Sequence, residues 1–359
     1  MTSLVRTDQP GLDDLREDLL DKVTRGARLI LEGAHAETGQ TPKEVIWSRN
    51  KARLYRYRSE TERQHRVPIL FVYALLNRPY CLDLMPGNSF VEFLVEEGFD
   101  VYLLDWGIAG PEDRDQTFDD LIVDYLPRAV RKVLRCAGTD EFTLFGYCMG
   151  GSMSLMYAAL FPEGIKNLIL LATPVDCSPE HTGLYGQWFA EPNHDPRVIV
   201  NAYGNLPPQF AYTGTALLNP VTNYIGKYVN MWEMILRDKP MTGWLAMSKW
   251  ADEAVPMPGG VYKQWVEDFY QHNRLAKGEL RLRGRRVDLS TITAPLLNIA
   301  GSKDHLVFLP QAEAAMDLVG SVDKEFVELE AGHVGLLTGR GAKKGLWPKV
   351  RDWLEPRST

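Results

Sequence analysis

The sequence predicts an α/β fold, in which a mostly parallel sheet is covered by helices on both faces and a cap domain is inserted into the core. Two observations lead to this prediction. Short apolar segments such as VPILFVYAL (67–75) alternate with helical segments in the first half of the chain, and the alternation resumes after residue 293. Strands that are apolar on both sides are typical of a parallel sheet buried beneath helices.

The first half of the chain divides into elements by the period of its apolar residues. Residues 12–37 carry leucines at helical spacing, and residues 44–59 alternate as a pair of strands does. After these we expect a strand at 67–75, a helix at 89–98, a strand at 99–106, a helix at 119–138, a strand at 141–146, a helix at 149–161 and a strand at 165–173. Gly98 and Gly138 end two of the helices.

The second half begins with a break in this alternation near Pro174. Residues 175–289 are rich in Trp, Tyr, Pro and Met and show no strand–helix alternation. We then expect a strand at 294–301, a helix near 309–319, a strand at 325–332 and a helix near 343–354. The predicted domains are therefore 1–60, an N-terminal helix and strand pair attached to the core; 61–174 and 290–359, the catalytic core; and 175–289, the cap.

Composition excludes several classes of protein. The 359 residues carry 40 Lys and Arg against 47 Asp and Glu, a net charge of −7, which argues against a nucleic-acid partner. The N-terminus lacks the basic start and apolar run of a signal peptide, and no window is apolar for long enough to suggest a membrane span. Four cysteines without short paired spacing predict neither a disulfide framework nor a metal site, so we expect a cytoplasmic protein.

The segment Gly146-Tyr147-Cys148-Met149-Gly150 lies between a predicted strand and a predicted helix. This is the setting of a nucleophile elbow, a strained turn whose neighbouring residues must be small. The helix N-terminus beneath the thiol favours the negative charge of a thiolate. The alternative is a buried structural cysteine in a glycine-rich turn. The flanking strand and helix favour the nucleophile.

A thiol nucleophile needs a base, and the base needs an acid to orient it. Asp304 directly follows the strand at 294–301, and His333 directly follows the strand at 325–332. Nucleophile, acid and base in this order along the chain are typical of the α/β-hydrolase fold. His305 is the rival for the base. We expect the oxyanion hole to use the backbone N–H groups of Met149 and Leu75.

A cysteine at this position has a chemical consequence. Transfer of an acyl group from coenzyme A to a thiol exchanges one thioester for another, so the acyl group stays activated for an alcohol. An apolar, tryptophan-rich cap could exclude the water that would otherwise hydrolyse it. This chemistry permits a transferase and does not exclude a hydrolase.

The chain resembles the catalytic subunit of bacterial poly(3-hydroxyalkanoate) synthases, most closely the short, two-component kind (classes III and IV, leaning toward class IV). The resemblance covers nearly the whole length. It rests on several motifs in order: VPILFVYALLNRPYCLDLMPGNS (67–89), DVYLLDWG (100–107), GYCMGG (146–151), LLATPVD (170–176), DFYQHN (268–273), KDHLV (303–307) and AGHVG (331–335).

The resemblance implies a nucleophile at Cys148, with Asp304 and His333 as the other members of a triad. It implies polymerisation of (R)-3-hydroxyacyl-coenzyme A into a growing polyester with release of coenzyme A and without a cofactor or a metal, and we expect a short-chain substrate such as 3-hydroxybutyryl-coenzyme A. Either His333 or Asp304 would activate the incoming hydroxyl. It also implies a homodimer, a second non-catalytic subunit and a place at the surface of cytoplasmic polyester granules.

We further expect His305, Asn77 and Tyr80 to contact the substrate. Two alternatives remain at this point. A thiol-dependent esterase or thioesterase of the dienelactone hydrolase type has the same elbow, but such enzymes are shorter and lack an insertion of this size. An inactive α/β-hydrolase scaffold that binds a granule or a partner would not be expected to keep all three residues of the triad in order.

Overall fold

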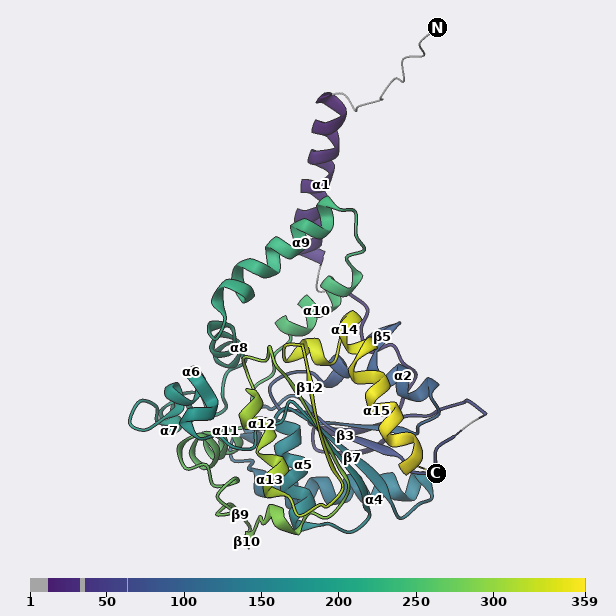
Figure 1. The fold of residues 1–359 in the computed structure, drawn as a ribbon. Coiled ribbons are helices and arrows are strands. Elements are labelled where there is room, and N and C mark those ends of the chain that lie inside the picture. The colour runs from purple at the N-terminus through teal and green to yellow at the C-terminus, as the bar shows by residue number, and fades with distance from the viewer. Residues whose placement is uncertain (1–11, 33–35, 63, 359) are drawn as a thin grey trace.

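The computed structural model describes residues 12–32, 36–62 and 64–358, and its centre is an eight-stranded sheet (Figure 1). The strand order is β1-β2-β6-β3-β7-β8-β11-β12. These strands are β1 Glu44–Arg49, β2 Ala52–Tyr57, β6 Val101–Asp105, β3 Ile69–Val72, β7 Phe142–Tyr147, β8 Ile165–Leu171, β11 Leu296–Gly301 and β12 Lys324–Leu329.

The six strands from β6 to β12 are parallel, and β1 and β2 extend the sheet antiparallel at one edge. In register, Leu70 of β3 lies opposite Tyr102 of β6 and Leu144 of β7. The chain passes from β3 to β6 on one side and then to β7 on the other. Such a reversal leaves a crevice at the carboxyl ends of the strands, where α/β proteins bind their ligands.

Helices cover both faces of the sheet, and their bounds are as follows: α1 Leu12–Glu32, α2 Phe90–Glu96, α3 Phe118–Asp120, α4 Leu126–Ala137, α5 Met149–Leu160, α6 Pro179–Phe189, α7 Pro196–Tyr203, α8 Pro208–Leu217, α9 Lys227–Leu236, α10 Thr242–Asp252, α11 Gly259–Gln264, α12 Leu309–Glu313, α13 Ala315–Leu318, α14 Gly339–Lys344 and α15 Leu346–Leu354. Helices α2 and α15 lie together on one face, with the rings of Phe93 and Trp347 5.4 Å apart. Helices α5, α12 and α13 lie on the other face (Figure 1).

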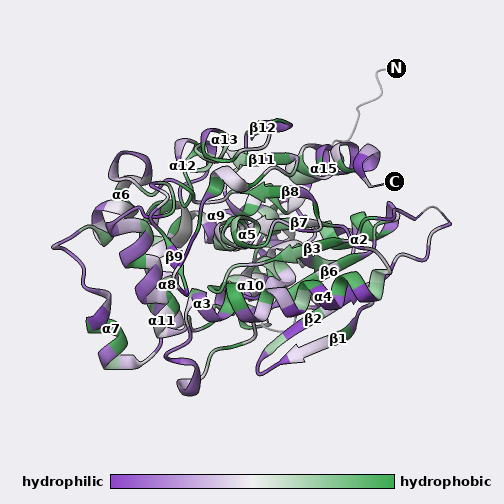
Figure 2. Ribbon diagram, turned by 90° about the horizontal axis from the view of Figure 1, so that it is seen from below, coloured by the Kyte–Doolittle hydropathy of each residue, from purple (hydrophilic) through white to green (hydrophobic). Residues whose placement is uncertain are grey.

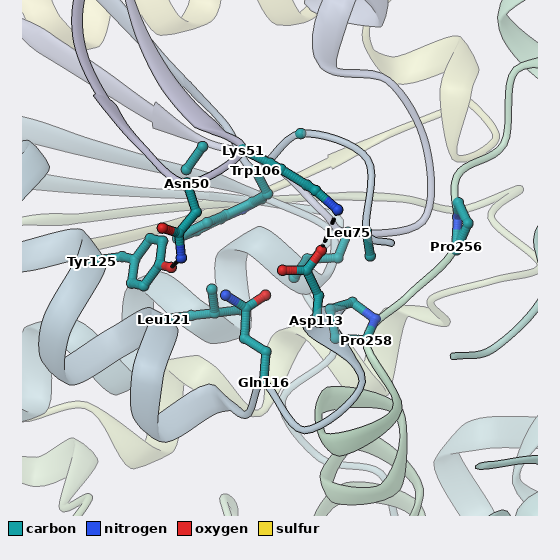
Figure 3. Close-up of a pocket in the computed structure, with 13 residues that line it drawn as sticks. Asn50, Lys51, Leu75, Trp106, Asp113, Gln116, Leu121, Tyr125, Pro256 and Pro258 are labelled. Atoms are coloured by element: carbon teal, nitrogen blue, oxygen red, sulfur yellow. Dashed lines mark hydrogen bonds and ion pairs between the residues drawn. The ribbon is translucent and has the colours of Figure 1, made fainter. Parts of the chain in front are cut away.

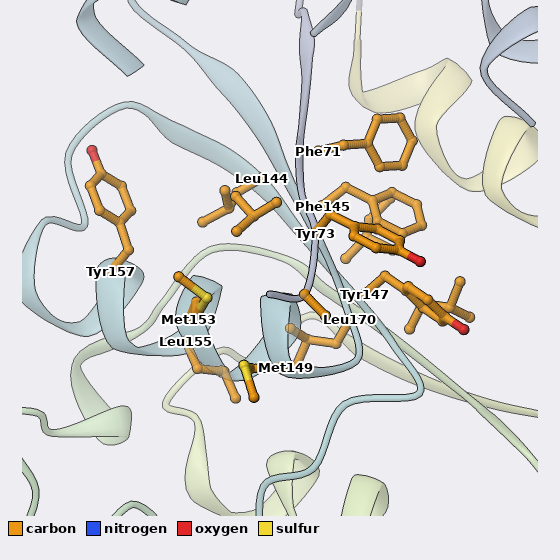
Figure 4. Close-up of a cluster of buried hydrophobic side chains, with 14 of the residues drawn as sticks. Phe71, Tyr73, Leu144, Phe145, Tyr147, Met149, Met153, Leu155, Tyr157 and Leu170 are labelled. Carbon is orange, nitrogen blue, oxygen red and sulfur yellow. The ribbon is translucent and has the colours of Figure 1, made fainter. Parts of the chain in front are cut away.

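The main core surrounds β3, β7 and α5. Phe71 and Phe145, on neighbouring strands, are fully buried with ring centroids 4.5 Å apart (Figure 4). Met149 and Met153 of α5 are also fully buried. The hydropathy colouring shows the inner strands and α5 as largely apolar (Figure 2). This burial fixes the strand and helix that flank Cys148.

Residues 175–289 contribute no strand to the eight-stranded sheet within the described residues. Their strands are the short hairpin β9 Arg281–Leu282 and β10 Arg285–Arg286, so the basic run RLRGRR is a hairpin with exposed arginines and a buried Leu282. Helix α9 and α1 together form an arm that projects from the body (Figure 1). The arm has its own small core of Met231, Ile235 and Met241. The exact bounds of the cap stay a prediction.

Several expectations differ from the structure, among them the helix near 309–319, which divides into α12 and α13. The predicted helix 12–37 ends at Glu32; residues 33–35 lie outside the described residues, and 36–37 are not helical. The predicted helix 119–138 divides into α3, a π-helical turn (η4, Leu121–Tyr125) and α4. A small hairpin of β4 Asp83–Met85 and β5 Asn88–Ser89 was not predicted, because its strands are too short to show a period.

Candidate active site

Cys148 joins the end of β7 to the start of α5 in a sharp turn. Its backbone has φ 55° and ψ −130°, a conformation that costs free energy in any residue with a side chain. Its N–H donates a hydrogen bond to the carbonyl of Leu171 at 2.9 Å, and its carbonyl accepts one from the N–H of Gly151 at 2.8 Å. The surrounding structure therefore holds the thiol in the arrangement that the elbow motif predicts.

The glycines around Cys148 are required by close approach. A Cβ added at Gly150 would lie 2.1 Å from the carbonyl oxygen of Val72, on β3. One added at Gly146 would lie 2.4 Å from the Cα of Gly151, and one at Gly151 would lie 1.8 Å from the hydroxyl of Thr173. The separations at Gly150 and Gly146 confirm that the neighbours of Cys148 must be small. Because Gly151 has no side chain, α5 can pack closely against the sheet.

Asp304 and His333 meet at the carboxyl ends of β11 and β12. His333 Nδ1 and Asp304 Oδ2 are 2.7 Å apart. The other carboxylate oxygen, Oδ1, accepts hydrogen bonds from the backbone N–H groups of Leu306 at 2.8 Å and Val307 at 3.0 Å. The Asp304 side chain is fully buried and that of His333 is 10% exposed. Both oxygens of Asp304 are therefore occupied, and His333 is held in one orientation.

The protonation of His333 follows from two opposing effects. Burial lowers its pKa, but the Asp304 carboxylate and the nearby Cys148 outweigh burial and raise the pKa well above 6.5. The imidazole is therefore stabilised as the cation between two groups that carry or can carry negative charge. Tyr147 packs beside the ring, with centroids 5.1 Å apart.

The thiol opens into a cavity of about 120 Å³, here called the thiol chamber. Its lining includes Cys148, His333, Tyr147, Asn77 and Trp250. A wider cavity of about 740 Å³, the outer cleft, adjoins it, because Asn77, Trp250 and His333 line both. A ligand in the outer cleft can thus reach the thiol.

The residues predicted to contact substrate are only partly brought together. Asn77 lines both cavities, and His305 lines the outer cleft. Tyr80 is not among the described residues that line either cavity; its hydroxyl donates a hydrogen bond to Glu253 at 2.8 Å. His305 lies beside Asp304 in the chain, but it is His333 that bonds Asp304.

The two predicted oxyanion donors differ in their surroundings. Met149 is the first residue of α5, and N–H groups in a first helical turn have no partner within the helix. Ala74 lines the thiol chamber, whereas Leu75 lines a separate pocket of about 20 Å³ beside Lys51 and Asp113 (Figure 3). That pocket holds little more than one water. The donor from Leu75 stays a prediction.

Helix α8 contributes residues that the sequence analysis missed. Ala211, Tyr212 and Thr215 all line the thiol chamber. Only the aromatic richness of residues 175–289 hinted at a wall for the site. No motif marks these three positions, because their role depends on how α8 packs over the sheet.

The described residues contain no group of three or more His, Cys, Asp or Glu side chains placed to hold a metal ion. Nor do they include a helix with the length and apolarity needed to cross a membrane.

Comparison with family models gives two matches. Residues 67–340 match the model described as alpha/beta hydrolase fold. Residues 9–94 match the model described as the N-terminus of poly-beta-hydroxybutyrate polymerase.

Several curated proteins are similar over most of the chain. A poly(3-hydroxyalkanoate) polymerase subunit from Haloferax mediterranei is 41% identical, with 95% of this chain and 69% of that protein covered. The corresponding subunit from Allochromatium vinosum is 36% identical over 96% of this chain and 98% of its own length. That from Synechocystis sp. is 35% identical, covering 97% and 95%.

Solved structures agree on the fold. A putative lipase from Sulfolobus solfataricus superposes with a TM-score of 0.56 at 16% identity, covering 88% of this chain and 99% of that one. A monoacylglycerol lipase from Paleococcus ferrophilus gives 0.53 at 18% identity, covering 85% and 99%. At these identities the likeness concerns the α/β-hydrolase fold alone.

Proposed function

The chain belongs to the poly(3-hydroxyalkanoate) polymerase family, and on that premise we propose that Cys148 carries the acyl group during polymerisation, with His333 as its base and Asp304 orienting His333. One observation supports this assignment above the others. Asp304 bonds His333 at 2.7 Å, and His333 and the Cys148 thiol line the same chamber at the strained elbow. Three residues far apart in the chain thereby form one connected site.

The first step is acylation of the thiol. The Cys148 sulfur attacks the carbonyl carbon of a (R)-3-hydroxyacyl-coenzyme A thioester and forms a new carbon–sulfur bond. The sulfur of coenzyme A leaves with the bonding electron pair and takes the proton from the His333 imidazolium. The N–H of Met149 is suited to stabilise the intermediate oxyanion. A raised His333 pKa supports this step, because it keeps on the imidazole the proton that the departing sulfur of coenzyme A needs.

The second step forms the ester. The 3-hydroxyl oxygen of another unit attacks the Cys148 thioester and gives its proton to His333, while the Cys148 sulfur leaves with its electron pair. This restores the thiolate and imidazolium. Both Asp304 oxygens already accept hydrogen bonds, which supports His333 rather than Asp304 as the base for the incoming hydroxyl.

We assign the outer cleft to coenzyme A. The coenzyme A part of this substrate carries several negatively charged phosphates. The lining of the cleft includes Lys227, Lys303 and His305, whose side chains suit such groups. Coenzyme A is thus both carrier and product, and this reaction needs no separate cofactor. Asn77, at the junction of the two cavities, is positioned for the acyl end of the substrate.

Assembly and location belong to the same proposal. The similar proteins are named as polymerase subunits, which supports a second, non-catalytic subunit for this chain. Helix α1 exposes Leu15, Leu19 and Leu20 by half or more of their surface, and such a patch suits a protein or polyester contact. A homodimer at the surface of cytoplasmic polyester granules accords with these features, and the chain would be of the two-component type.

The test uses purified protein and (R)-3-hydroxybutyryl-coenzyme A, with and without a candidate second subunit. Free coenzyme A is followed with a thiol reagent, and the acyl product is sized by chromatography. We expect high-mass polyester from the wild type and a fall of more than about a thousandfold in Cys148→Ala, with the fold retained by circular dichroism. Release of free 3-hydroxybutyrate in place of polymer would show that water takes the acyl group. Polymer from Cys148→Ala would remove the thiol from the mechanism.

A further inference from the structure

A third cavity lies beyond the thiol chamber and has no role in the steps above. It has a volume of about 200 Å³, and we call it the aromatic chamber. Leu76 and Ala211 line both it and the thiol chamber, so they form the constriction between the two. Its aromatic lining consists of Tyr185, Trp188, Phe189, Phe210, Tyr262 and Trp265.

The aromatic chamber differs from the outer cleft in charge. No Asp, Glu, Lys or Arg is among the described residues that line it, whereas Lys227 and Lys303 line the outer cleft. Its one histidine, His194, lies 2.7 Å from the Tyr262 hydroxyl, and burial lowers its pKa, so the ring is neutral at neutral pH. An uncharged wall favours an uncharged ligand over one that carries phosphates.

The chamber also reaches the surface. Phe210 lines it from α8 yet is 44% exposed, and its ring meets that of Tyr203 edge-on at 5.3 Å. Tyr203, at the end of α7, is itself 60% exposed. The chamber therefore ends at an apolar rim on the side chains of two neighbouring helices.

We propose that the aromatic chamber is the exit passage of the growing polyester, which enters it from Cys148 between Leu76 and Ala211 and leaves over Phe210 and Tyr203. This rests on the proposed role of Cys148. The chain of a poly(3-hydroxyalkanoate) is narrow, uncharged and ester-linked. The volume is below the range of about 300–1,000 Å³ found for pockets that hold drug-sized molecules, so the chamber suits a thin chain rather than coenzyme A. Substrate and product then use separate routes to one thiol.

Gly214→Leu tests the passage. Gly214 lines the aromatic chamber but not the thiol chamber, and a Cβ there meets nothing within 4 Å. A leucine fills chamber space that the chain needs and is also favoured over glycine within α8. We expect the first coenzyme A per active site to leave within about twofold of the wild-type rate, as rapid quenching measures it, while polyester mass falls about fivefold or more.

Thr213→Leu is the matched control, because it places the same side chain one position away on the exposed side of α8. We expect it to make polymer of wild-type mass. Should Gly214→Leu fail to fold, Phe210→Glu puts a charge at the rim on a side chain that is already half exposed, and we expect shortened polymer again.

Two results would overturn the passage. Polymer of unchanged mass from Gly214→Leu and Phe210→Glu would mean that the chain leaves elsewhere. A first-turnover rate that falls as far as polymer mass would mean that the chamber holds the incoming acyl group. Failure of the site assignment is separate, since it would be seen as coenzyme A release from Cys148→Ala.

Discussion

At the scale of single residues, the sequence predicted those positions where chemistry and backbone geometry demand one residue type. Gly150 had to be small, and the carbonyl of Val72 lies where its side chain would be. Asp304 and His333 followed from strand order, and the structure brings them within 2.7 Å. Tyr80 had no such constraint, and its hydroxyl pairs with Glu253 instead of lining either of the two cavities. Side-chain direction in a loop depends on packing that local sequence does not encode.

The raised pKa of His333 gives a prediction for pH. The folded protein binds this proton more tightly than the unfolded chain, so the resulting stability is fully present below about pH 6.5 and is lost as pH rises through the folded pKa. Because glutamine cannot bind the proton, the difference in free energy of unfolding between wild type and His333→Gln should shrink in urea titrations as the pH rises from about 6.5 through the folded pKa. Coenzyme A release should fall about 10²- to 10⁴-fold. A difference that stays constant with pH would contradict the ion pair.

At the scale of elements, apolar runs predicted every strand of the parallel sheet. The inner strands are buried on both faces and so are apolar throughout, whereas β12, at the edge of the sheet, is only partly buried. The boundaries were less predictable. The helix expected at 119–138 contains the π-helical turn η4, which buries Leu121, Ile122 and Tyr125. The spacing of apolar residues shows that a segment is helical. It does not show where a turn of the helix contains one extra residue, as in a π-helix. The role of α8 in the site was likewise invisible before its packing was known.

The junction of β3, β7 and α5 should be intolerant of any added volume. In Gly150→Ala the new methyl group would meet the carbonyl oxygen of Val72 at 2.1 Å, so β3 and α5 must separate. We expect the free energy of unfolding in urea to fall by about 1–3 kcal/mol. Gly341→Ala is the control, because it lies exposed in α14 with nothing near its Cβ, and there the change should be neutral or slightly stabilising. Equal effects at the two sites would refute the close-packing argument.

At the scale of the whole molecule, charge poses a problem for the proposed substrate. The chain has a net charge of −7, and coenzyme A is an anion, so the average field opposes binding. The outer cleft is lined by Lys227 and Lys303, which also pair with Asp252 at 3.9 Å and Glu330 at 2.7 Å. Lys227 is the more enclosed of the two, with 24% of its side chain exposed against 64%. The composition shows that the chain as a whole is negatively charged. Only the fold shows that lysine side chains line the outer cleft.

Removing one of these charges should weaken substrate capture without altering the chemistry. We expect Lys227→Gln to raise the KM for (R)-3-hydroxybutyryl-coenzyme A about three- to tenfold with kcat little changed, and to reduce the dependence of KM on salt. Lys239→Gln provides a comparison, since Lys239 is exposed and lies outside the cleft. An unchanged KM would show that the phosphates bind elsewhere.

The thiol is held by the sheet and α5, whereas one part of the wall around it comes from α8. Different parts of the gene therefore encode the residues that hold the thiol and the residues of α8 that shape the space around it. Directed evolution confined to the codons of α8 and its neighbours can explore new monomers while every library member keeps the same reactive centre.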